Sequence, residues 1–156
     1  MTSASAHTAA GGTRSNVQKA AMLSGIVFIL VGLLGFVPGI TSHYGEMKFA
    51  SHESGAMLLG LFQVSILHNI VHLLYGVVGL ALASTVGKAR SYLIWGGIIY
   101  LVLWIYGLIV DQMSMANFVP LNTADNWLHL GLGIVMVALG YFLTRSPRSN
   151  TSAAGR

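Results

Sequence analysis

Two stretches of this chain carry the same polar motif, and its residue types are those that bind ligands. Residues 68–76 read HNIVHLLYG, and residues 125–133 read DNWLHLGLG. Both fit the pattern [His/Asp]-Asn-x-[Val/Leu]-His-Leu-x-x-Gly, and each motif opens a long apolar stretch. Polar side chains in a setting that lipid surrounds are costly, so they indicate a functional or structural site by default.

The spacing within each motif places its polar residues on one face of a helix. His68 and His72 are four residues apart, as are Asp125 and His129. Residues at this spacing lie one above the other on a helix. If the two faces meet, three imidazoles and one carboxylate converge just below one surface of the protein.

Three interpretations of this His/Asn/Asp cluster stay open. In the first, the side chains satisfy one another, and Asp125 caps a helix by accepting free backbone N–H groups. In the second, the cluster binds a divalent metal such as zinc, iron or manganese. The ligands would be His68, His72, Asp125 and His129, with Asn69 and Asn126 as a second layer of hydrogen-bonding groups. In the third and weakest, His72 and His129 hold a haem b between two helices.

The composition indicates that the elements carrying these motifs lie in a membrane. Of 156 residues, 54% are hydrophobic and only 8% are charged, against a usual charged share of roughly 25%. Apolar runs of about 18 residues or more are typical of transmembrane helices. Four such runs are present, at 17–37, 68–87, 91–110 and 126–144. The predicted fold class is therefore an all-α integral membrane protein with four transmembrane helices.

The basic residues predict the orientation of the four helices. With four crossings, all four acidic residues fall on one side, together with Lys48. The other seven basic residues fall on the side of both termini, and they are Arg14, Lys19, Lys88, Arg90, Arg145, Arg148 and Arg156. Loops rich in Lys and Arg stay in the cytoplasm. Both termini and the connection between the second and third helices are therefore expected to be cytoplasmic.

The two motifs belong to a longer internal repeat. GIVFILVGLLGF at 25–36 resembles GIIYLVLWIYGL at 97–108, at an offset of 72, whereas the motifs repeat at an offset of 57. Both halves start from the same side, which predicts two parallel-repeat helical hairpins related by a pseudo-two-fold axis along the membrane normal. The extra length lies in the first outer connection. There, the apolar segment 54–67 is predicted to be an additional helical segment before the second span.

The termini and the absent motifs narrow the function further. Residues 1–16 and 145–156 are small and polar, and we expect disordered cytoplasmic ends flanking a transmembrane domain at 17–144. The basic residues form no stripe, which excludes nucleic acid as a partner. The chain has no cysteine, and it has no nucleophile elbow, phosphate-binding glycine loop or H-E-x-x-H motif. These absences favour a protein that is not an enzyme.

Three long segments make the chain similar to a known family. The segments are ASHESGAMLLGLFQVSILHNIVHLLYG, YLVLWIYGLIVDQ and ANFVPLNTADNWLHLGLG. They resemble an actinobacterial family of small integral membrane proteins, the domain of unknown function 4383, and the similarity covers roughly residues 17–142. The resemblance implies four spans in a bacterial plasma membrane and no established activity. It marks as family positions Asn117, Pro120, Asn122, Asp125, Asn126 and His129, together with His68, Asn69 and His72.

The favoured function is a non-catalytic accessory or interaction module with an outward-facing, buried His/Asn/Asp cluster. Its expected partners are the lipid bilayer and either another membrane protein or a second copy of the chain. The alternative is a redox or transport component that binds a metal or haem through the same cluster.

Overall fold

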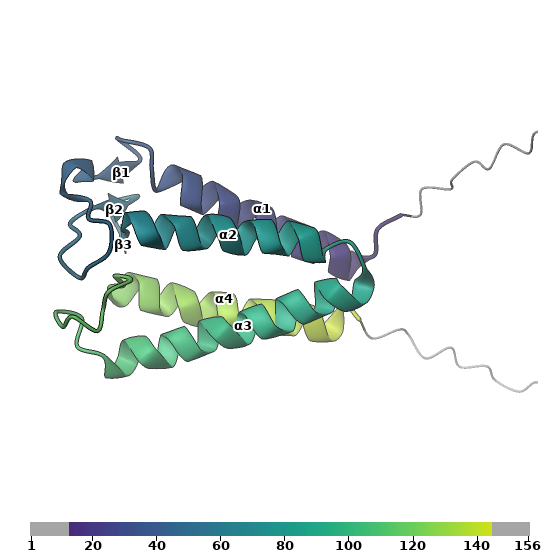
Figure 1. Cartoon of the computed structure of the whole chain (residues 1–156). Helices are drawn as coiled ribbons and strands as arrows, with labels where there is room; N and C mark the ends of the chain where they lie inside the picture. Colours follow the sequence, from purple (N-terminus) through teal and green to yellow (C-terminus); the bar gives the residue numbers. More distant parts are fainter. Residues whose placement is uncertain (1–12, 145–156) are drawn as a thin grey trace, which may run out of the picture.

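The computed structural model describes residues 13–144, which form four helices and a small sheet (Figure 1). The helices are α1 (Asn16–Leu34), α2 (Ile66–Leu82), α3 (Val86–Ile109) and α4 (Thr123–Phe142). The mostly helical fold and the four helices are thus confirmed. The predicted disordered tail at 145–156, and most of the predicted disordered N-terminus, lie outside the described residues.

Each helix begins at a side chain that accepts a hydrogen bond from a backbone N–H of the first turn. The capping residues are Ser15, Ser65, Thr85 and Asn122. Such a cap contributes about 1 kcal/mol to helix stability. The cap at Thr85 starts α3 earlier than the apolar run at 91–110 predicted, because capping fixes a helix end that hydropathy does not detect.

The helices pair in two hairpins, α1 with α2 and α3 with α4, as Figure 1 shows. Glycines allow close contact in both pairs. A Cβ atom on Gly25 would lie 2.8 Å from the Gly76 carbonyl oxygen, and one on Gly97 would lie 2.8 Å from that of Gly133. Both distances are too short for any residue with a side chain. Each hairpin thus has a glycine contact between its two helices; Gly97 follows Gly25 by 72 residues, and Gly133 follows Gly76 by 57.

The hairpins contact each other through α1 and α3. The buried core between them includes Phe28 of α1 and Tyr92, Leu93 and Tyr100 of α3. At one end, the Gln18 side-chain amide donates to carbonyl oxygens of the connection between α2 and α3. Most of the large apolar side chains lie outside this core, on the outer surface of the bundle.

The segment before α2 differs from the prediction. It was expected to be an additional helical segment, and that expectation is wrong. The chain forms a three-stranded antiparallel sheet of β1 (Thr41–Ser42), β2 (Met57–Leu58) and β3 (Phe62–Gln63), with a short 3₁₀ helix η1 at Tyr44–Glu46. Leu59 and Gly60 both have positive φ angles, 55° and 70°. This backbone turns the chain back on itself, so β2 and β3 pair as a hairpin.

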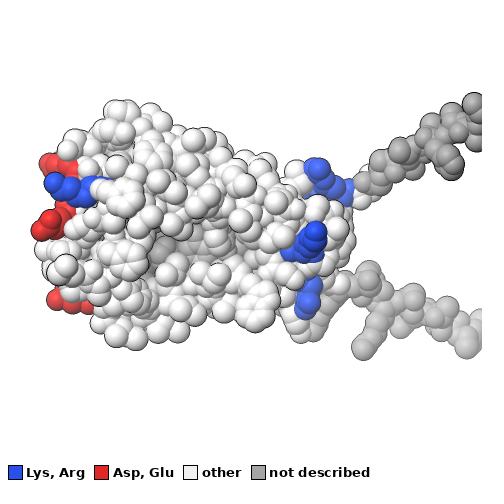
Figure 2. Space-filling model, in the orientation of Figure 1, with Lys and Arg blue, Asp and Glu red and all other residues white. Residues whose placement is uncertain are grey.

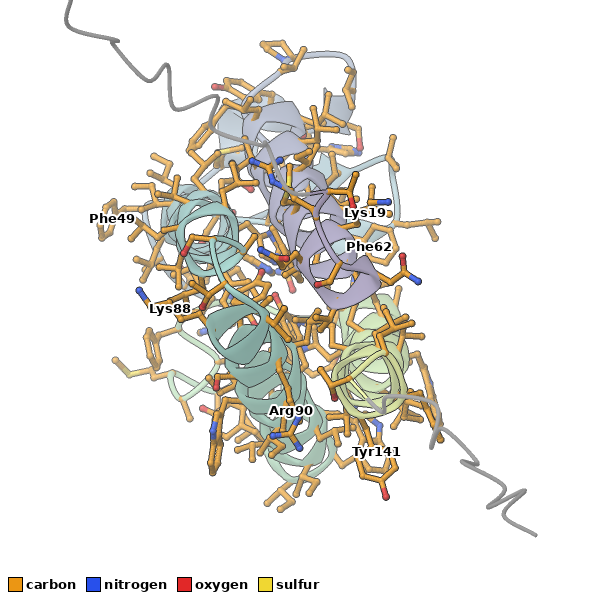
Figure 3. The ribbon with its side chains drawn as sticks, turned by 90° about the vertical axis from the view of Figure 1, so that its right-hand side faces the viewer. Lys19, Phe49, Phe62, Lys88, Arg90 and Tyr141 are labelled. Atoms are coloured by element: carbon orange, nitrogen blue, oxygen red, sulfur yellow. The ribbon has the colours of Figure 1, made fainter. Side chains whose placement is uncertain are left out.

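The charged side chains of the described residues lie at the two ends of the bundle (Figure 2). Arg14 and Lys19 lie at the start of α1, and Lys88 and Arg90 lie at the start of α3, at the end of the bundle called here the basic end. Figure 3 looks onto that end and labels Lys19, Lys88 and Arg90. The opposite end, called the sheet end, carries β1–β3, the connection between α3 and α4, and the acidic residues (Figure 2).

Two of the helices, α1 and α3, are long and apolar enough to cross a membrane. Helix α2 is also apolar but has 17 residues, the lower limit of the usual length for a span.

Candidate functional site: a histidine cluster between the two hairpins

The two motifs lie close together at the sheet end, and each forms a hydrogen bond with the segment that precedes the other motif. Asp125, in the first turn of α4, accepts the backbone N–H of Gln63 at 2.9 Å. His68, in the first turn of α2, contacts the carbonyl oxygen of Pro120 through Nδ1 at 3.0 Å. A carbonyl oxygen only accepts, so His68 Nδ1 is the donor.

The residues of these two hydrogen bonds are related by a single sequence offset. Asp125 follows His68 by 57 residues, and Pro120 follows Gln63 by the same offset. The direction of donation is reversed between them: the imidazole donates to a carbonyl in one, and the carboxylate accepts from an N–H in the other. Each half therefore holds the connection that precedes the other half's second helix.

Asp125 also caps its own helix, as the first interpretation of the cluster expects. Its Oδ2 accepts the N–H of Asn122 at 2.9 Å, and Asn122 Oδ1 accepts the N–H of Asp125 in return. The carboxyl group precedes the apolar run 126–144 and is only 3% exposed. Burial raises its pKa to about 7, and the hydrogen bonds from Asn122 and Gln63 counteract part of that rise.

His72 and His129 lie deeper in the bundle, each against an aromatic ring of the core. The ring centroids of His72 and Phe28 are 5.9 Å apart, and those of His129 and Tyr100 are 5.1 Å apart. His68 lies 4.6 Å from His72, ring to ring. The Nδ1 atoms of His72 and His129 are buried and have no hydrogen-bond partner among residues 13–144.

Asn69 and Asn126 are buried, but against glycines of the neighbouring helix. The Asn69 amide fills the space beside Gly35, and the Asn126 amide fills the space beside Gly107. Both amide atoms of Asn69, and Oδ1 of Asn126, have no hydrogen-bond partner within the described part of the chain. The role of Asn69 and Asn126 as a second layer of hydrogen-bonding groups therefore stays a prediction.

The histidines separate two pockets. The larger pocket has a volume of about 340 Å³ and lies between α2 and α3, under the connection that precedes α4. The smaller pocket, about 80 Å³, lies between α1 and α4, under the sheet. Both pockets are lined by His68, His72 and His129. Of the two pockets, Asp125 lines only the smaller.

Some lining residues of the two pockets are related by the offset of 57. Val71 and Leu121 line the larger pocket, and the residues 57 positions away, Leu128 and Val64, line the smaller one. The smaller pocket is also lined by residues of the β2–β3 hairpin: Leu58, Leu59 and Phe62. Figure 3 shows Phe62 on the side of α1 and α4. The longer first connection thus fills the space that the shorter second connection leaves open.

The described residues contain no group of three or more His, Cys, Asp or Glu side chains that could hold a metal ion. His68 Nδ1 and Asp125 Oδ2 already form hydrogen bonds with the backbone. The structure does bring the three predicted histidines together at shared pockets. The predicted metal site at His68, His72, Asp125 and His129 stays a prediction.

Sequence reasoning did not identify the aromatic residues of the site. Phe28 and Tyr100 stack between the histidines, and Tyr75 packs edge-on against both rings. A signal for the first two was present, because the fourth position of both segments matched at an offset of 72 is aromatic. The partners Gln63 and Pro120 act through backbone atoms, which residue type does not reveal.

The fold and site define a small four-helix protein with a buried histidine cluster and at least two helices suited to a membrane. The chain belongs to the family described as domain of unknown function (DUF4383), whose model matches residues 18–142. The family to which its segments are similar is thereby confirmed. No curated protein and no solved structure matches the chain.

Proposed function

We propose that this protein is a non-catalytic accessory or interaction module of a bacterial plasma membrane, crossing it four times with both termini in the cytoplasm. The basic end would face the cytoplasm and the sheet end the outside, as the positive-inside rule requires. The contacts that link His68 to Pro120 and Asp125 to Gln63 carry this proposal. In these contacts the ionisable side chains of the motifs have a structural role, because they join the two hairpins.

The surface between the two ends supports four spans. Large apolar side chains are exposed on every helix, for example Leu30 on α1, Leu74 on α2, Val102 on α3 and Val135 on α4. Soluble monomers rarely expose continuous apolar surface on this scale. Helices α2 and α4 would therefore contact lipid in the same way as α1 and α3, although α2 is short for a span.

The equivalent positions of the two halves support an origin as two parallel-repeat hairpins. The glycine crossings, the helix caps at Ser65 and Asn122, and the exchanged contacts at the sheet end all follow the offsets of 72 and 57. A repeat with both halves in the same orientation places its axis along the membrane normal. The His/Asn/Asp cluster would then lie on this axis, close to the outer surface.

The proposed topology can be tested by labelling single cysteines, since the chain has none of its own. Three exposed positions are suitable: Gly45 and Met115 at the sheet end, and Ser84 between α2 and α3. A membrane-impermeant maleimide should label Gly45→Cys and Met115→Cys in intact cells, and Ser84→Cys only after permeabilisation. Labelling of Ser84→Cys in intact cells, or protection of Met115→Cys there, would contradict the four-span topology.

The alternative function, a redox or transport component that binds a metal or haem, rests on the unpartnered Nδ1 atoms of His72 and His129. Elemental analysis and an absorption spectrum of the protein purified in mild detergent separate the two functions. The accessory module should contain no stoichiometric metal and show no Soret band. Bound iron or zinc that is lost in both His72→Ala and His129→Ala would support the alternative and contradict the accessory module.

A further inference from the structure

The larger pocket has the size and lining of a binding site for a small lipid-soluble molecule. Its volume of about 340 Å³ falls within the range of roughly 300–1,000 Å³ that is typical of ligand pockets. A dry cavity of about 150 Å³ holds a benzene molecule, so this pocket has room for roughly two fused rings. Aromatic side chains of Tyr100, Tyr106 and Phe118 form part of its lining and could pack against such rings.

Two of the histidines that line the pocket have a ring nitrogen without a partner among the described residues. His129 is 5% exposed, and its Nδ1 forms no hydrogen bond within residues 13–144. The same is true of Nδ1 of His72, and both histidines line the pocket. Leaving a buried polar group unsatisfied costs about 1–3 kcal/mol. Both Nδ1 atoms have almost no accessible surface, so a ligand's hydrogen-bonding group would recover that free energy once either imidazole turns its Nδ1 toward the pocket.

The chemistry of the lining restricts the polar group of the ligand. Among residues 13–144, no Lys, Arg, Asp or Glu lines the pocket, so these residues offer nothing to pair with a charged ligand, and burying an unpaired charge is very unfavourable. A ring nitrogen of a neutral histidine is either a donor or an acceptor. A hydroxyl group both donates and accepts, so it can bind either form.

The side wall of the pocket indicates the route of entry. Val71 on α2 and Phe118 in the connection before α4 line the pocket and are 43% and 57% exposed. Both belong to the apolar surface that would face lipid in the proposed topology. A molecule dissolved in the outer leaflet could therefore enter between α2 and α3 without crossing water.

We propose that the pocket between α2 and α3 binds the neutral, hydroxyl-bearing ring of a lipid-soluble molecule taken from the outer leaflet, with the hydroxyl hydrogen-bonded to His72 or His129. The route of entry rests on the proposed topology, whereas the pocket and the histidines that line it are features of the described residues alone.

The test uses 1-naphthol as probe and the full chain purified in detergent. A ligand that binds the folded state raises the unfolding temperature in a concentration-dependent way. We expect this rise with 1-naphthol, and at least tenfold weaker binding of naphthalene, which has the rings without the hydroxyl. The double variant His72→Phe/His129→Phe should bind both probes equally weakly. No rise with 1-naphthol, or equal binding of naphthalene to the wild type, would overturn the proposal.

A matched pair of variants locates the binding site. Val71→Trp fills the larger pocket, and Leu128→Trp makes the same change at the repeat-related position of the smaller pocket; the two positions are 43% and 41% exposed. Binding of 1-naphthol should be lost in the first variant and retained in the second. Ala116→Trp, at an exposed position of the larger pocket, should also abolish binding and serves if Val71→Trp does not fold. Unchanged binding in Ala116→Trp and Val71→Trp would overturn the proposal, whatever the cysteine labelling shows.

Discussion

The ring of Phe28 stacks on the ring of Tyr100, with centroids 5.4 Å apart and planes 12° from parallel. The two residues are 72 positions apart, the offset that relates α1 to α3. Each ring also contacts the deeper histidine of its own half, His72 for Phe28 and His129 for Tyr100. The stack therefore joins equivalent positions of the two hairpins and supports both histidines from the core side.

Removing one ring of this stack should destabilise the whole bundle. We expect Phe28→Ala to lower the free energy of unfolding by about 3–5 kcal/mol, because truncation of a buried aromatic residue leaves a cavity. Ile26→Ala, on the exposed face of the same helix, should cost about 0.5 kcal/mol or less. Unfolding by a denaturing detergent, followed by circular dichroism, measures both. Equal losses in the two variants would contradict a stack that joins the halves.

The glycine crossing between α1 and α2 leads to a prediction with a control on α4. A Cβ atom on Gly76 would lie 2.5 Å from the Gly25 carbonyl oxygen, whereas one on Gly131 would have no atom of the described residues within 4 Å. Gly76→Ala should separate the helices and lower the free energy of unfolding by about 1–3 kcal/mol. Gly131→Ala should leave stability unchanged or raise it by about 1 kcal/mol through helix propensity. The same unfolding assay measures both variants. Unchanged stability of Gly76→Ala would show that α1 and α2 do not cross at this glycine.

Removing the Asp125 carboxylate should weaken the contact between the halves. Asp125→Ala leaves two backbone N–H groups, of Gln63 and Asn122, without their acceptor. We expect a loss of about 1–3 kcal/mol in the free energy of unfolding. Glu53→Ala, at an exposed acidic residue of the same end, should change it by about 0.5 kcal/mol or less. Hydrogen exchange should also show faster exchange of the Gln63 amide in Asp125→Ala, and unchanged exchange would contradict the contact.

The raised pKa of Asp125 predicts how stability depends on pH. In the unfolded chain this pKa is near its ordinary 3.8, and in the folded protein it is about 7. The folded state therefore holds the proton more tightly, so the stabilising contribution of this group is complete below about pH 4 and is lost as pH rises through 7. Asp125→Asn keeps an oxygen acceptor and cannot titrate.

The measurement is the unfolding temperature of wild type and Asp125→Asn between pH 4 and pH 8. We expect the wild type to lose stability relative to the variant as pH rises across that range. Parallel curves for the two proteins would mean that the Asp125 carboxyl group is not held in a buried site.

Much of the fold followed from the sequence, because its signals are strong. The four apolar runs predicted the four helices, and the spacing of four residues correctly placed His68 beside His72. The helix ends were less accurate, since side-chain caps such as Thr85 set them. The sheet was missed because its turn depends on Leu59 in a left-handed backbone conformation, which is unusual for a bulky residue.

The candidate site was predictable only in part, for a physical reason. Matching motifs indicated that the halves approach each other, and the three histidines do line common pockets. The partners of His68 and Asp125 are main-chain atoms of Pro120 and Gln63. Every residue has such atoms, so their position depends on the path of the connecting segments, which a pattern of residue types does not specify.

The β2–β3 hairpin has a consequence for stoichiometry. Two identical halves would form two identical pockets, and such a protein would bind two ligand molecules per chain. Leu58, Leu59 and Phe62 line the smaller pocket, which has a volume of only about 80 Å³. The protein can therefore bind a single ligand molecule, in the larger pocket. A titration of the monomeric protein should therefore saturate at one molecule of 1-naphthol per polypeptide.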